Sequence, residues 1–167
     1  AVVFAVAALV AVTSTHFAVV FPRPETRRPA LAQMLTFLGL FMSGLAFSPW
    51  IVADVRLQKA NYLQPVYGPA FWLLGAHMML SSTWALAHLA GKLRHTTGFA
   101  RAQIHYVFLG AGLTAAGALT LGVVVPLVTG SSRFGVYGPY FTLLWLGFTA
   151  HSIVRHRLMD VRIVISR

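Results

Sequence analysis

Hydrophobic residues occur along this chain in five long runs, and short polar segments that carry prolines and charges separate them. The runs lack strict alternation, and each has about the 18–20 residues that a helix needs to cross a hydrocarbon layer of about 30 Å. In lipid every backbone N–H and C=O must be paired within its own segment or in a closed barrel, so the runs predict helices. The predicted membrane spans are 1–21, 31–53, 68–91, 104–125 and 137–154.

The composition also indicates an all-α, polytopic membrane helix bundle. Of the 167 residues, 57% are hydrophobic and 10% are charged, whereas a soluble domain has about 25% charged residues. No polar stretch is long enough for a soluble domain, so we expect a single transmembrane domain over 1–167. The chain starts at Ala1 with an apolar run that no charged segment precedes, and we expect it to be a fragment of a longer protein.

Charge is distributed unevenly between the two sides of the predicted bundle. Ten of the 13 Lys and Arg residues fall on one side if the five spans alternate in direction, and three fall on the other. The positive-inside rule therefore places the N-terminus outside and the C-terminus in the cytoplasm. The basic residues do not form one patch with exposed aromatic residues, which argues against a nucleic-acid partner. The three on the outer side are Arg56, Lys59 and Arg133.

The sequence lacks the motifs of common catalytic sites. The chain has no cysteine, no nucleophile elbow, no zinc-protease motif and no phosphate-binding loop. Its acidic residues, Glu25, Asp54 and Asp160, lie outside the middle of the spans, unlike the buried carboxylate of a proton-coupled transporter. We therefore predict neither catalysis nor a metal site in this segment.

Four histidines lie within the predicted spans and are candidate cofactor ligands: His16, His77, His88 and His151. Ser81 and His88 follow His77 at helical spacing, so the three share one helix face. His16, His88 and His151 lie near the cytoplasmic ends of their helices, where two of them could bridge a haem iron. Isolated histidines in a bundle are more commonly hydrogen-bonded core or interface residues, and no cofactor is predicted.

Small residues recur along the fourth span, with Gly110 and Gly117 among them. Small side chains at intervals near four residues allow two membrane helices to approach closely. The pattern is consistent with ordinary packing inside the bundle or with a homodimer face.

The C-terminal part of the chain carries a distinctive run of residues. Its members are Ala150, Ile153, Arg155, Arg157, Leu158, Met159, Asp160, Val161 and Arg162. This run resembles the end of the last helix in the seven-transmembrane N-terminal sensor region of bacterial histidine kinases and related signalling proteins. Two further stretches, 15–23 and 101–110, also resemble that family.

The resemblance implies that the five spans are the last five of seven helices in a bacterial inner membrane. The absence of the first two helices would place the N-terminus outside, as the loop charges also predict. The resemblance supplies no shared catalytic or ligand residue. Arg155, Arg157, Asp160 and Arg162 become candidates for signal transmission and for anchoring to anionic lipids. The arginines are equally consistent with a topology signal and no further role.

These patterns are compatible with two functions. The first is a non-catalytic sensor or signal-transmission module, coupled to a cytoplasmic output domain after Arg167. The second is a structural subunit that packs against other transmembrane helices in a larger bioenergetic or pigment-protein complex. The coding sequence downstream of Arg167 would discriminate between them.

Overall fold

The computed structural model describes residues 1–22, 29–58, 62–129, 133–138 and 140–165, without the side chains of 56–58, 62–64, 133, 136, 153 and 155–165. Helices make up most of this part of the chain, and one β-hairpin interrupts them. The elements are α1 (Val2–Val20), α2 (Ala30–Leu45), β1 (Val52–Gln58), β2 (Tyr62–Tyr67), α3 (Phe71–His95), α4 (Gly98–Leu119), a π-helical segment (Thr120–Val124), α5 (Val125–Thr129), a 3-10 turn (Arg133–Tyr137) and α6 (Tyr140–Ile165).

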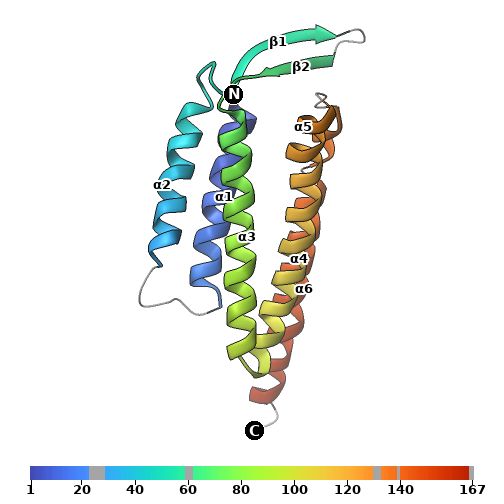
Figure 1. Ribbon diagram of the computed structural model, residues 1–167. Coiled ribbons are helices and arrows are strands. Elements are labelled where there is room, and N and C mark those ends of the chain that lie inside the picture. Colours follow the sequence, from blue (N-terminus) through green and yellow to red (C-terminus); the bar gives the residue numbers. More distant parts are fainter. Residues whose placement is uncertain (23–28, 59–61, 130–132, 139, 166–167) are drawn as a thin grey trace.

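The long helices form two groups that lie side by side (Figure 1). Helices α1, α2 and α3 pack against one another, and α4 packs along α6. The ribbons of α3 and α4 converge toward the lower end of the view, where a short turn joins them. There a cluster of buried apolar residues connects α1, α3 and α4. Its members are Ala18, Ala85, Leu89, Ile104 and Val107.

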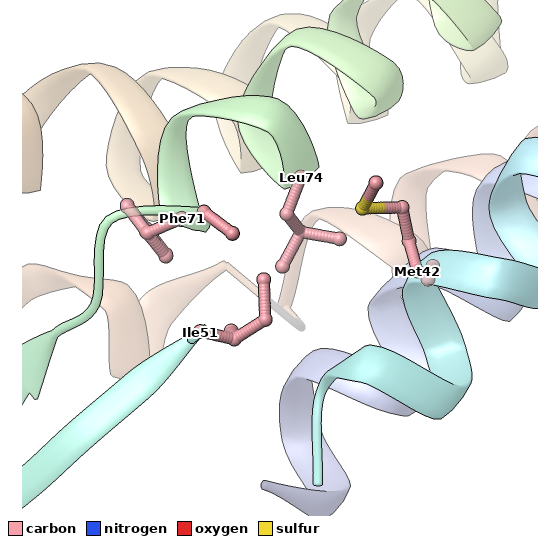
Figure 2. Packing of buried hydrophobic residues seen from close by; sticks show 6 residues of the cluster. Met42, Ile51, Phe71 and Leu74 are labelled. Atoms are coloured by element: carbon pink, nitrogen blue, oxygen red, sulfur yellow. The ribbon is translucent and has the colours of Figure 1, made fainter. Parts of the chain in front are cut away.

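A second buried cluster closes the upper end of the three-helix group. Met42 of α2, Ile51 at the start of the hairpin, and Phe71 and Leu74 of α3 point toward one another (Figure 2). Ile51 is fully buried. The cluster therefore holds the base of the hairpin against the helices.

The predicted span 31–53 is wrong in its last part, because α2 ends at Leu45 and an antiparallel hairpin follows. Pro49 explains the end of the helix, since it lacks an N–H and disfavours helical dihedrals at the preceding residue. Beyond it, polar and apolar residues alternate from Asp54 to Gln58, as in a strand. The all-α prediction thus holds for the helices but missed β1 and β2.

Three other helices extend beyond the predicted spans. Helix α3 continues to His95 and α4 begins at Gly98, so most of the segment between the predicted spans 68–91 and 104–125 is helical. Gly98 has a φ of 65°, in the left-handed region that glycine enters without strain. Helix α6 continues beyond the predicted membrane span, to Ile165.

Two helices in the described part of the chain are long and apolar enough to cross a bilayer. They are α1 and the continuous helical run from Gly98 to Thr129. Helix α2 is apolar but has 16 residues, fewer than the roughly 18–20 that a span needs. Length and apolarity thus support a membrane helix bundle, whereas five spans remain a prediction.

Large apolar side chains cover much of the outer surface. Phe37 of α2 is 72% exposed, Leu146 of α6 is 63% exposed and Val128 of α5 is 80% exposed. Soluble monomers rarely expose contiguous apolar patches larger than a few hundred Å², roughly. This surface is suited to lipid or to other apolar helices.

Candidate functional site

Helix α6 carries the residues that the sequence indicates for signal transmission. It runs without interruption through 26 residues, and its lower end leads to the C-terminus (Figure 1). Arg155, Arg157, Asp160 and Arg162 all lie in the last three or so turns of this helix. Their side chains are outside the described residues, so the structure places their backbone alone.

Two glycines of α4 lie directly against α6. A Cβ atom on Gly110 would be 2.8 Å from Cβ of Phe148 and 3.1 Å from Cα of Trp145. A Cβ atom on Gly117 would collide with the ring of Phe141. The small residues therefore permit close approach of two helices in the same chain.

A hydrogen bond from Thr114, which lies between the two glycines along α4, links the same two helices. The hydroxyl of Thr114 donates to the main-chain carbonyl oxygen of Phe141 over 2.6 Å. Thr114 is buried, so its hydroxyl would otherwise lack water to bind. Close packing and this bond together make α4 and α6 a tightly joined pair.

Lys92 binds the end of another helix. Its Nζ donates to the main-chain oxygens of Ala18 at 2.8 Å, Val19 at 2.7 Å and Phe21 at 2.9 Å. These carbonyls end α1 and lack donors within the helix, and the helix dipole also favours a cation there. Lys92 of α3 thus caps the C-terminal end of α1. The sequence alone indicates a positive charge on this side of the bundle and does not indicate this contact.

The first candidate histidine, His16, lies between α1 and α2. Its Nε2 is 3.1 Å from the hydroxyl oxygen of Thr36, which also donates to the main-chain oxygen of Ala32. The hydroxyl hydrogen cannot serve both, so the ring nitrogen is the donor when both bonds form. His16, Gln33 and Thr36 line a cavity of about 230 Å³ between α1 and α2.

The second candidate, His77, is buried between α3 and α2. Its Nδ1 is 3.5 Å from the hydroxyl oxygen of Ser81, and its Nε2 has no hydrogen-bond partner in the described part of the chain. A Cβ on Gly39 of α2 would be 2.8 Å from Nε2. The imidazole therefore occupies the space that the absent side chain of Gly39 leaves.

The other two candidates contact aromatic rings. His88 stacks on Trp84 one turn earlier in α3, with ring centroids 4.8 Å apart. His151 of α6 meets Tyr106 of α4 edge to face at 5.3 Å. The four histidines thus have different neighbours. Within the described residues, no group of three or more His, Asp or Glu could hold a metal ion.

Two apolar cavities lie between the helix groups. The upper cavity, of about 450 Å³, is lined by α1, β2, α3, the last turn of α4, the π-helical segment, α5, the 3-10 turn and α6. The lower one, of about 120 Å³, is lined by α1, α3, α4 and α6. They have four lining residues in common. These are Val10, Met78, Ala118 and Thr142.

The wall of the upper cavity includes an irregular helix segment. Residues Thr120–Val124 form a π-helix, and Gly122 and Val123 line the cavity. Pro126 accounts for the irregularity, because it cannot donate to the carbonyl of Gly122 and its ring would crowd that group in a regular α-helix. Such π-helical turns often occur at functional sites.

Comparisons of the chain with protein-family models, curated proteins and solved structures gave no match. The resemblance to the sensor region of histidine kinases therefore stays a prediction. The contacts and cavities of the chain itself are the basis for assigning a function.

Three features of this geometry were not predicted: the Lys92 cap, the bond from Thr114 and the two cavities. The only hint of the cavities in the sequence is Gly122 close to Pro126. A proline preceded by glycine within an apolar run indicates an irregular helix, although it does not indicate which helices face it.

Proposed function

We propose that this chain is a multi-pass helix bundle of a bacterial inner membrane that transmits a conformational change to a cytoplasmic output domain after Arg167. The proposal assigns five spans, an external N-terminus and no reaction to this segment. The exposed apolar side chains of the helices and the excess of basic residues on one side support it.

The observation that carries the proposal is the continuity of α6. A helix transmits rotation or axial movement only if it is unbroken between its two ends, and α6 is helical from Tyr140 to Ile165. Its upper part lines both cavities through Thr142. Its lower part carries the basic run that would leave the membrane.

The pairing with α4 defines the moving unit. Gly110, Thr114 and Gly117 hold α4 against α6, so a displacement of one helix would move the other. Arg155 and Arg157 would meet anionic lipid head groups at the membrane surface. Leu158 to Ile165 would then carry the motion to the output domain.

Alanine insertions between Arg157 and Leu158 in the full-length protein test this proposal. Each inserted residue rotates the following helix by about 100°, since an α-helix has about 3.6 residues per turn. Output activity should therefore oscillate over one to four insertions, and an insertion of seven residues should restore it because the phase returns. Equal activity for all insertions, or a gene without an output domain, would contradict the proposal.

Cysteine labelling tests the orientation independently, because the chain has no cysteine of its own. Cysteines replacing Thr26 and Thr96 should be protected from membrane-impermeant thiol reagents in intact cells, whereas a cysteine replacing Ser131 should react. Permeabilised cells provide the control, in which all three should react. The inverse pattern in intact cells would contradict an external N-terminus.

A second function, a structural subunit of a larger membrane complex, is favoured by the outer face of α2. Met34, Phe37 and Phe41 are spaced along one face and are 63–72% exposed, which suits contact with another transmembrane subunit or with a second copy. Native mass spectrometry of the protein extracted in mild detergent separates the two functions. A stoichiometric complex with other membrane subunits, lost in Phe37→Ser but kept in Leu146→Ser, would support the structural role.

A further inference from the structure

We infer that the two adjoining cavities form one binding site for a chain-like apolar molecule that carries an oxygen acceptor, such as an ester of an acyl or isoprenoid chain. Binding of this kind goes beyond the proposed signalling function and does not depend on it. Four observations support it: the shape, the volume, the lining and one unpartnered donor.

The site is long. Along α1 its lining extends from Val3 at the upper end to Phe17 at the lower end, which corresponds to roughly 21 Å at a rise of 1.5 Å per residue. The upper cavity has about 450 Å³ and the lower one about 120 Å³. An extended chain fits such a space better than a compact ring system does.

The volume is that of a small-molecule site. Ligand cavities commonly have roughly 300–1,000 Å³, and the upper cavity lies within that range.

The lining is apolar, and so is its rim. Val3, Val6 and Val10 of α1 line the upper cavity and are 76%, 51% and 44% exposed. Exposed side chains that also line a cavity mark its mouth. An apolar mouth on the outer face of a membrane helix would admit molecules from the bilayer.

The deep end contains a donor without an acceptor. Trp145 of α6 lines the lower cavity, and its Nε1–H is buried without a hydrogen-bond partner in the described residues. Buried indole N–H groups usually find an acceptor. An ester or carbonyl oxygen on the bound chain would supply one. This contact distinguishes the proposed ligand from a plain hydrocarbon.

Binding can be measured with the methyl ester of cis-parinaric acid, a fluorescent acyl chain, added to the purified protein in lipid nanodiscs. Energy transfer from tryptophan to the probe reports occupancy, and titration gives Kd. Gly122→Leu is the main variant, because the added side chain enters the upper cavity and a Cβ there meets no described atom within 4 Å. Gly44→Leu is the matched control, since Gly44 has equally open surroundings but lies outside both cavities.

We expect saturable binding that Gly122→Leu weakens by at least about tenfold and that Gly44→Leu leaves unchanged. Ala118→Phe, where the two cavities meet, should act like Gly122→Leu and provides a second variant if the first does not fold. Trp145→Phe should weaken the methyl ester more than a matching hydrocarbon probe, because the hydrocarbon has no acceptor for the indole N–H.

Three outcomes would overturn the inference. The first is probe uptake that does not saturate or that is equal in all variants, which indicates partition into lipid. The second is an unchanged Kd in Gly122→Leu together with loss of an oligomer, which would assign the groove to a partner helix. The third is an equal effect of Trp145→Phe on both probes. The alanine insertions below Arg157 should leave probe binding unaltered, so failure of the signalling proposal would be seen separately.

Discussion

The two halves of the continuous helical run from Gly98 to Thr129 have different surroundings. In the lower half Ile104 and Val107 are buried in the cluster with α1 and α3, and Gly110 lies against α6. From Ala111 upward the helix borders the two cavities, although Gly117 still lies against Phe141 of α6, and its regular hydrogen-bond pattern gives way to the π-helical segment that starts at Thr120. The run is thus packed against α1, α3 and α6 at its lower end and borders empty space on one side at its upper end.

This difference indicates where the bundle can change shape. A packed core resists changes in volume, so the lower ends of the two helix groups should move as one body. The cavity and the π-helical segment leave the upper ends less constrained. Under the proposed function, a change in the separation between the α4–α6 pair and α1 and α3 at this end would tilt α6, which would carry the tilt toward the C-terminus.

The largest expected effect comes from adding the same side chain in the two halves. Gly110→Leu should lower the stability by about 3 kcal/mol or more, because the main chain of Trp145 blocks the added atoms. Gly122→Leu should change it by less than about 0.5 kcal/mol, since the space there is open. Thermal unfolding in detergent measures both. Similar losses in the two variants would show that the upper half is as tightly packed as the lower half.

Removal of the Lys92 cap tests how the lower end is held. Lys92→Met keeps an apolar stem of similar length but loses three hydrogen bonds to the end of α1, and we expect a loss of about 2 kcal/mol. Arg94→Met removes a charge from the same helix at an exposed position and should have little effect. Equal melting temperatures for the two variants would mean that Lys92 contributes charge alone.

The helices were predictable because their signal is local. Long apolar runs indicated all five long helices, although the end of α2 was missed since Ile51 to Ala53 continue the apolar run beyond Pro49. The apolar run alone does not indicate the last turns of α6, because Arg155 to Arg162 interrupt the run with charges. Arginine and leucine are nonetheless good helix formers, and the helix continues through them.

The contacts were not predictable because they join residues far apart in the chain. Lys92 and Ala18 are 74 positions apart, and nothing near either residue identifies the other. The cavities depend on how completely two helix faces fill the space between them, which a single helix pattern does not show. The sequence identifies Gly110 and Gly117 as packing residues, but it does not identify α6 as the helix against which they pack.

The smallest effect concerns the hydrogen bond that links α4 to α6 at the boundary between the two halves. Thr114→Val keeps the shape of the side chain and removes the donor to the carbonyl oxygen of Phe141, so stability should fall by about 1 kcal/mol. Thr13→Val is the matched control, because that hydroxyl is exposed and donates to Val10 within its own helix. We expect the control to change the melting temperature much less. If Thr114→Val behaved like the control, the glycine contacts alone would hold the pair, and tilting of α4 would depend on packing without a fixed hydrogen bond to α6.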